Sequence, residues 1–342
     1  MSSGPWRMTT SALLALALGC TGAIEAPAAG PVEAPGTRPR RLACDAISPG
    51  RSPLQRLTRV QYDRAIEDLF GDATRPATRL VDGERGEVNA DARIVSTTLA
   101  NQYLLAAEDV SERATADLEA FLGCEASAAC MDAWLTRRGR LVFRRPLSDT
   151  EHEALGALYR TVEGEFGAQQ GTRAVLEAML QSPAFLYRVE IPEEEALAGG
   201  ADIVRLGAYA LATRLAFALW QSTPDAELLD RAEAGDLDDD DGVAAVAREM
   251  LADPRAEAGM LAFFEHYLDL GQLDGLTKDP ATFPDFDATI PPLLRQETEQ
   301  FLLAVFRSED ASWEELLTAD WTMMNGALSA YYGLGEVRGP DC

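Results

Sequence analysis

The stretch TRVQYDRAIEDLFG, from Thr58 to Gly71, shows most directly how this chain folds. Thr58 and Gln61 stand three residues apart in the form of a capping box, which is typical of a helix N-terminus. Gly71 is the last residue of the stretch, and glycine is common where a helix ends. Between these signals the apolar residues recur at helical spacing: Val60, Ala65, Ile66, Leu69 and Phe70. The stretch predicts an amphipathic helix.

The same helical periodicity continues along most of the chain. A second capping box, Ser148 to Glu151, begins another amphipathic segment, and Leu206 to Trp220 is nearly all apolar, as in a buried central helix. No alternating strand-like run of useful length occurs in the sequence. Further helices are expected over about 96–123, 131–143, 171–181, 225–234, 242–252, 255–270, 290–307 and 312–318. The sequence therefore predicts an all-α fold of several packed helical modules.

Two short segments predict how individual helices begin. In Thr223-Pro224-Asp225, a capping residue is followed by a proline for the first turn and by an acid that interacts favourably with the helix dipole. This order predicts a helix capped by Thr223. The acidic run DLDDDDG over 236–242 is not a calcium-binding loop of the EF-hand type, because Leu237 and Arg248 replace two of the required acids. We expect this run to cap the helix that follows it.

The length and composition divide the chain into segments. A chain of 342 residues is expected to form two or three packed units rather than one core. An acidic, glycine-bearing linker, PEEEALAGGAD over 192–202, separates two of them. The expected boundaries are a lipoprotein-type signal (1–20), a disordered tether rich in Ala, Pro and Gly (21–50), and helical modules over 51–122, 123–195 and 203–342.

The N-terminus has the pattern of an export signal. Arg7 precedes a short apolar run, Ser11–Gly19, which is too short to span a bilayer. The run ends at Cys20 and resembles a bacterial lipoprotein signal, in which this cysteine carries two acyl chains, enough for stable anchoring. An ordinary cleaved signal peptide is the alternative. We expect a cell-envelope lipoprotein, anchored in the outer membrane and facing the periplasm or the exterior.

The strongly acidic composition narrows the range of partners. The formal net charge of -26 repels phosphate backbones, so no nucleic acid partner is expected. Anionic lipid surfaces are disfavoured for the same reason, which leaves the lipid anchor as the expected means of membrane attachment.

Cysteine usage agrees with export to an oxidising compartment. Cys124 and Cys130 bracket a short loop, EASAA, and are predicted to form a local disulfide. Cys44 and Cys342 either pair with each other or stay free. No C-x-x-C motif is present and the chain has only two histidines, so neither a metal site nor another cofactor is predicted.

Five arginines form the main basic patch: Arg137, Arg138, Arg140, Arg144 and Arg145. Guanidinium groups bind carboxylates through paired hydrogen bonds, so this patch is a candidate site for a carboxylate-bearing ligand such as an acidic polysaccharide. The alternative is structural: the arginines tie helices together by pairing with the protein's own Asp and Glu residues.

No residue can be assigned to catalysis. The sequence contains no G-x-S-x-G, P-loop or dinucleotide-binding motif, and carboxylate pairs arise by chance in so acidic a chain. His266, within the apolar segment FFEHY, is the best candidate for a redox or metal role, but a histidine on a helix face needs no such role. Catalytic residues stay unknown, and an enzyme is not expected.

Five segments in order carry a resemblance to a known group of proteins: RLTRVQYDRAIEDLFGD (56–72), RRGRLVFRRPLSDTEHEAL (137–155), MLQSPAFLYRVE (179–190), TRLAFALWQSTPDAELLDRAEAGDL (213–237) and MLADPRA (250–256). The chain resembles the planctomycete and myxobacterial multidomain surface proteins, which are built from tandem domains of unknown function. The resemblance spans roughly 51–335. It implies three consecutive helical modules in surface machinery that is suspected of handling polysaccharides, without an established active site.

Two functions remain open from the sequence. The first is a surface lipoprotein that binds or scaffolds, with a polysaccharide or a surface protein as its partner. The alternative is a component of an extracellular degradative or redox enzyme system. Because members of the resembling group usually continue beyond the equivalent of SAYYGLGEVRG (329–339), a fragment truncated within the third module and lacking functional C-terminal domains is a further alternative.

Overall fold

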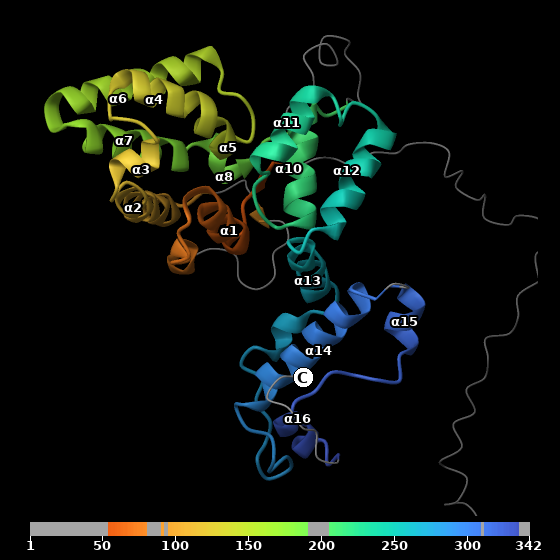
Figure 1. The fold of residues 1–342 in the computed structure, drawn as a ribbon. Helices are drawn as coiled ribbons and strands as arrows, with labels where there is room; N and C mark the ends of the chain where they lie inside the picture. Colours follow the sequence, from red (N-terminus) through yellow and green to blue (C-terminus); the bar gives the residue numbers. More distant parts are fainter. Residues whose placement is uncertain (1–53, 81–89, 92–94, 191–204, 309–310, 335–342) are drawn as a thin grey trace, which may run out of the picture. The chain divides into compact units, whose positions relative to one another are not determined.

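The computed structural model describes residues 54–80, 90–91, 95–190, 205–308 and 311–334 (Figure 1). The chain divides into two compact units, 1–50 and 51–342, and the first lies wholly outside the described residues. The predictions for the signal segment, Cys20, the tether and Cys44 fall there. The predicted linker at 192–202 and Cys342 also lie outside the described residues.

The second unit is built from helices, so the all-α prediction is confirmed (Figure 1). Its first part contains β1 (Gln55–Arg56), α1 (Arg59–Phe70), the 3-10 helix η1 (Pro76–Arg79), β2 (Ala90–Asp91), α2 (Thr97–Ala114) and α3 (Leu118–Leu122). The next part contains α4 (Ala128–Trp134), the π-helical turn η2 (Leu135–Gly139), α5 (Arg140–Phe143), α6 (Asp149–Phe166), α7 (Ala168–Leu180), α8 (Pro183–Leu186) and β3 (Tyr187–Arg188).

The third part follows the predicted linker. It contains α10 (Ala208–Leu219), α11 (Ala226–Ala234), α12 (Asp240–Ala252), α13 (Ala256–Tyr267), the 3-10 helix η3 (Leu270–Leu273), α14 (Ile290–Phe306), α15 (Trp313–Thr318) and α16 (Gly326–Tyr331). Among the described residues, no helix has both the length and the apolar character that crossing a bilayer requires.

Both predicted capping boxes form. The Thr58 hydroxyl accepts a hydrogen bond from the Gln61 amide at 3.2 Å, and the Gln61 side chain accepts one from the Thr58 amide at 3.2 Å. The Ser148 hydroxyl accepts from the Glu151 amide at 3.3 Å, and the Glu151 carboxylate accepts from the Ser148 amide at 2.8 Å. These reciprocal bonds satisfy backbone donors that a helix start leaves free, and they fix where α1 and α6 begin.

Two predicted helix boundaries are wrong. The helix expected over 96–123 is broken after α2, where the Thr115 hydroxyl bonds to the Ser111 carbonyl and Asp117 caps the separate helix α3. Helix α11 is capped by Asp225, whose carboxylate accepts from the Leu228 amide at 2.9 Å, and not by Thr223. A carboxylate accepts more strongly than a hydroxyl, which explains the choice of cap. The acidic run at 236–242 does cap α12, through Asp239.

A small antiparallel sheet pairs the start of the first part of the unit with the end of the second part. Its strand order is β2-β1-β3, with Gln55 opposite Arg188 and Arg56 opposite Tyr187. The Leu57 amide also donates to the Leu186 carbonyl at 2.9 Å. The chain therefore enters these two parts and leaves them at the same place.

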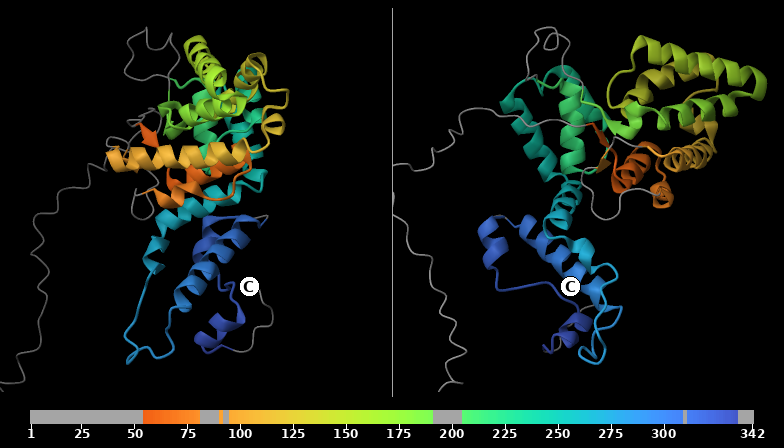
Figure 2. Two further views of the ribbon diagram at one scale, coloured as in Figure 1. Left: turned by 90° about the vertical axis from the view of Figure 1, so that its left-hand side faces the viewer. Right: turned by 180° about the vertical axis from the view of Figure 1, so that it is seen from behind.

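Two hydrophobic cores hold the unit together. The first joins α1 and α2 to the antiparallel pair α6 and α7, which lie side by side (Figure 2), and its largest side chains include Tyr62, Trp134 and Phe185. The second core lies within α10 to α13 and contains Trp220, whose indole N–H donates to the Met250 carbonyl at 3.1 Å. Among the described residues from 205 onward, Phe217 alone belongs to the first core.

The structure joins Cys124 and Cys130 in a disulfide, the pairing that the sequence favours, with a Cα–Cα distance of 6.0 Å. The bridge ties the end of α3 to α4, and the Cys130 side chain packs into the first core. The crosslink thereby holds the loop that connects the first two parts of the unit.

Candidate functional site

The five arginines of the basic patch do not converge on one point. Arg138 donates to the Leu69 carbonyl at 3.2 Å, and Arg140 pairs with Asp230 at 2.5 Å on α11. Arg137 is exposed and donates to the Ala133 carbonyl of the preceding helical turn. Of these three, Arg140 agrees with the structural alternative because it pairs with an acid on another helix, whereas Arg137 and Arg138 donate to backbone carbonyl groups.

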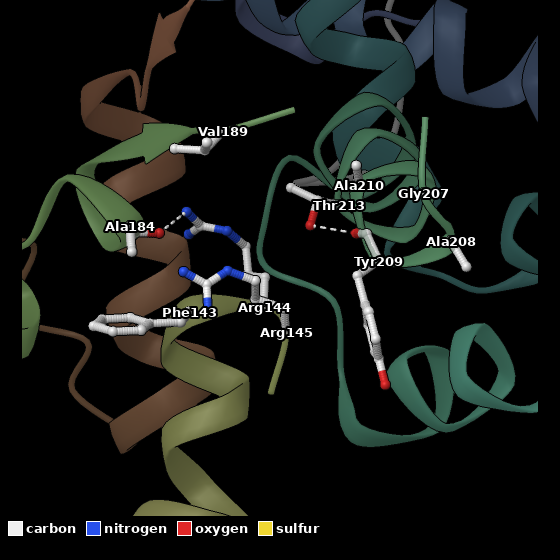
Figure 3. Close-up of a pocket in the computed structure, with 10 residues that line it drawn as sticks. All are labelled: Phe143, Arg144, Arg145, Ala184, Val189, Gly207, Ala208, Tyr209, Ala210 and Thr213. Carbon is white, nitrogen blue, oxygen red and sulfur yellow. Dashed lines mark hydrogen bonds between the residues drawn. The ribbon is translucent and has the colours of Figure 1, made fainter. Parts of the chain in front are cut away.

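Arg144 and Arg145 instead line a cavity of about 390 Å³ (Figure 3). One wall comes from the segment between α5 and Pro146 and from the segment around β3, and the other wall comes from the start of α10. The lining residues are Phe143, Arg144, Arg145, Ala184, Val189, Gly207, Ala208, Tyr209, Ala210 and Thr213. Of this set, only the two arginines belong to the basic patch that the sequence predicts as a ligand site.

Arg144 is held in place by backbone carbonyl groups. Its side chain is buried, and one of its amino groups, Nη2, donates to the carbonyls of Ala184 at 2.6 Å, Phe185 at 3.1 Å and Tyr187 at 2.7 Å. The residue has a φ of 59°, in the left-handed region that a side chain makes unfavourable. The carbonyl contacts must therefore offset both a strained backbone and a buried charge.

The charge of Arg144 has no acidic partner within the described residues. Its other amino group, Nη1, is buried without a hydrogen-bond partner there. Burial lowers the pKa of Arg144 to about 9, with further lowering by the positive charges of Arg188 and Arg145. The guanidinium is still charged at neutral pH, so the cavity wall contains a cation that no carboxylate among the described residues neutralises.

Arg145 differs because an acid faces it. Its two amino groups contact the Glu151 carboxylate at 2.8 and 2.9 Å in a bidentate pair. This pair, together with bonds from Ser148, lowers the pKa of Glu151 to about 2 although partial burial acts in the opposite direction. Arg145 therefore presents a partly neutralised guanidinium to the cavity.

Replacing this acid should make the protein less stable in a pH-dependent way. Glu151→Gln is expected to lower the free energy of unfolding by about 1–2 kcal/mol at pH 7, since the change removes an ion pair and weakens a cap. Because the folded-state pKa of Glu151 lies below its unfolded value, its stabilisation is present above about pH 4.5 and is lost as the pH falls towards 2. Urea unfolding at pH 7 and pH 3 measures both effects.

The control for this measurement is Glu153→Gln, the same chemical change at an exposed position of the same helix. If Glu151→Gln lowers the free energy of unfolding equally at both pH values, or by no more than Glu153→Gln does, the Glu151 carboxylate does not have the stabilising role described.

The second wall of the cavity carries an aromatic ring and a hydroxyl. The Thr213 hydroxyl donates to the Tyr209 carbonyl at 2.8 Å, and the Tyr209 ring extends along the cavity (Figure 3). No local motif marks these residues, because they reach the cavity only through contacts between segments far apart in the sequence.

The structure gives His266 no comparable setting. It lies exposed near the C-terminal end of α13, and its neighbour Glu265 pairs with Arg295 at 2.5 Å. Within the described ranges, no group of three or more His, Cys, Asp or Glu side chains is arranged to hold a metal ion.

Family models match most of this unit. Residues 55–116 match PSD3, protein of unknown function (DUF1587), and residues 130–190 match PSD5, protein of unknown function (DUF1595). Residues 206–334 match PSD4, protein of unknown function (DUF1592). The chain is a tandem of three domains of unknown function. No curated protein and no solved structure matches it.

The cavity lies where the second of these domains meets the third. Its first wall, including Arg144 and Arg145, comes from the DUF1595 segment, and its second wall, including Tyr209, comes from the DUF1592 segment. The Arg140–Asp230 ion pair joins the same two domains. The candidate site is thus a property of the tandem and is absent from either domain taken alone.

Proposed function

We propose that this chain is an exported, lipid-anchored surface protein that binds carboxylate-bearing saccharides, as a non-catalytic part of polysaccharide-handling machinery. The apolar run ending at Cys20 supports export and anchoring. The order of three tandem domains supports kinship with the multidomain surface proteins that the sequence resembles.

The observation that carries the binding proposal is the unmatched charge of Arg144. A buried cation is costly unless an anion accompanies it, and the described residues supply backbone carbonyls but no carboxylate. At about 4 Å, a ligand carboxylate would gain roughly 4 kcal/mol of Coulomb energy at an effective dielectric constant of 20, before its own desolvation. The cavity therefore favours an acid over a neutral ligand.

The size and lining of the cavity fit a sugar acid. A volume of about 390 Å³ lies in the lower part of the range of small-ligand sites, roughly 300–1,000 Å³. The Tyr209 ring offers an aromatic face for the apolar side of a sugar ring, and the arginines line the opposite wall (Figure 3). The net charge of -26 opposes anions at long range, but screening limits this repulsion to about 8 Å at physiological salt.

Calorimetric titration of the full chain tests the proposal. Oligomers of glucuronic or galacturonic acid are expected to bind, and neutral glucose oligomers of equal length at least tenfold more weakly. Arg145→Leu should weaken uronate binding about tenfold or more, the cost of one charged hydrogen-bonding partner. The matched control is Arg137→Leu, which removes an exposed arginine of the same patch from outside the cavity.

Equal binding of neutral and acidic oligomers, equal effects of the two arginine changes, or no binding of uronates would refute the binding proposal. The mass of the mature N-terminus tests the lipid on Cys20 separately, because an unmodified or differently cleaved terminus contradicts the anchor alone.

A further inference from the structure

Helix α13 is rich in apolar residues, yet few of them are fully buried and two of its aromatic rings are exposed. Within its twelve residues, AEAGMLAFFEHY, only Ala256 and Gly259 are buried. Phe263 is 52% exposed and Tyr267 is 63% exposed. Large aromatic rings that stay exposed beside one another on a helix often mark a surface where a partner binds, so this face of α13 is suited to a partner.

The exposed rings of α13 form an ordered cluster with Trp313 of α15. Phe263 stacks on Tyr267 with ring centres 5.7 Å apart, and Trp313 lies 5.8 Å from Phe264 and 6.2 Å from Tyr267. Aromatic pairs at these distances attract one another. The cluster is therefore held in a fixed arrangement before anything binds to it.

Next to this cluster lies an apolar groove of about 290 Å³. Met260, Phe263 and Phe264 line it from α13, and Leu302, Val305 and Phe306 line it from α14. Both sets have the spacing i, i+3 and i+4, which forms ridges along a helix. Two such ridges side by side leave a channel into which the side chains of a third helix fit.

The lining of this groove argues against a sugar. Ser312 is the only residue with a polar side chain among those that line it. Sugars expose several hydroxyl groups, each of which needs a hydrogen-bond partner when it is buried. The described residues of the groove supply no set of such partners, so the occupant that fits them presents a hydrocarbon surface.

The acidic charge of the third domain indicates the charge of the partner. Glu314 and Glu315 directly follow Trp313, and from 256 to 334 the acids far outnumber the three bases. The base nearest the groove in sequence, Arg307, is already paired with Glu257 at 2.6 Å. An anionic membrane surface would be repelled here, whereas a basic peptide would be attracted.

From these observations we propose that the groove between α13, α14 and α15 docks an amphipathic α-helix of a partner protein, with apolar side chains at i, i+3, i+4 and i+7 and basic residues on its flanks. The apolar face of such a helix would pack into the groove, and its basic flanks would interact with the surrounding acidic residues. This surface belongs wholly to the third domain and is separate from the cavity that Arg144 lines.

Fluorescence anisotropy with the full chain and synthetic peptides tests the inference. The probe is a labelled peptide of about 18 residues with leucine on one helical face and lysine elsewhere, long enough for five turns. One comparison peptide replaces every lysine by glutamate, and another has the same composition in scrambled order. The lysine peptide is expected to bind at least tenfold more tightly than either, and more weakly as salt rises.

Variants of the protein locate the binding. The double change Phe263→Gln and Trp313→Gln should weaken binding of the lysine peptide tenfold or more, since it removes two exposed rings of the groove. The matched control, Phe166→Gln, alters a 63% exposed ring on α6 and should leave binding unchanged. Circular dichroism checks that each variant is folded.

Three outcomes would overturn the inference. The first is a scrambled or glutamate peptide that binds as tightly as the lysine peptide. The second is a control variant that loses as much binding as the groove variant. A third is that the groove variant loses binding to neutral glucose oligomers or to phosphatidylcholine vesicles while peptide binding is unaffected, which would assign the surface to a sugar or a membrane.

Discussion

Gly259→Ala is expected to lower the free energy of unfolding of the third domain by about 3 kcal/mol or more. Gly259 lies where α13 crosses α10, and a methyl group there would stand 2.3 Å from the Leu219 carbonyl oxygen and 2.7 Å from that of Ala218. Both atoms belong to the backbone of a helix, so no side chain can rotate away. The two helices would have to separate, and the second core would lose packing along α10 and α13.

The matched control is Gly164→Ala, which makes the same chemical change within α6. A methyl group at Gly164 meets nothing within 4 Å, and the residue is exposed. Alanine there should raise stability by about 0.5–1 kcal/mol, because it reduces the freedom of the unfolded chain. Urea unfolding followed by circular dichroism compares the two. Changes of the same sign would show that the helix crossing is looser than described.

Phe217→Ala is expected to lower stability by about 3–4 kcal/mol and to separate the unfolding of the third domain from that of the first two. Phe217 is fully buried and carries α10 into the first core. Its ring also lies under two guanidinium groups, 5.5 Å from that of Arg144 and 5.8 Å from that of Arg188. The truncation thus removes both a large apolar surface and a contact that the buried Arg144 needs.

Differential scanning calorimetry measures the separation. The wild-type chain should give one main transition, and Phe217→Ala two transitions of which one moves to lower temperature. Phe217→Leu is the control, since it keeps most of the apolar volume and removes only the aromatic face. A single transition in the alanine variant, at the wild-type temperature, would mean that other contacts join the domains.

The helix starts were the most predictable features of the sequence because their causes are local. Each capping box, at Thr58 and at Ser148, needs only residues within one turn, so the sequence contains the whole interaction. The disulfide between Cys124 and Cys130 is local in the same sense. The start of α11 is different: the sequence predicts a cap at Thr223, which is wrong, because the order of residues does not show that the Asp225 carboxylate reaches the Leu228 amide.

The packing face and the cavity could not be predicted, because they depend on contacts between distant segments. Val60 has the helical spacing of a core residue, yet it is 54% exposed, and Tyr62 is buried in its place. Arg144 and Tyr209 lie on opposite walls of one cavity although 65 positions separate them in the sequence. Neither residue carries a local signal that predicts this arrangement.

The pairing of Gln55 with Arg188 has a consequence for how such proteins can evolve. Residues 55 and 188, the two ends of the segment that contains the first two domains, are on paired strands, so their Cα atoms are about 5 Å apart. A segment whose ends lie so close together can be transplanted into a surface loop of an unrelated host without forcing that loop apart. Recombination can therefore insert the first two domains together as one segment, provided that the host supplies an apolar side chain in the place of Phe217.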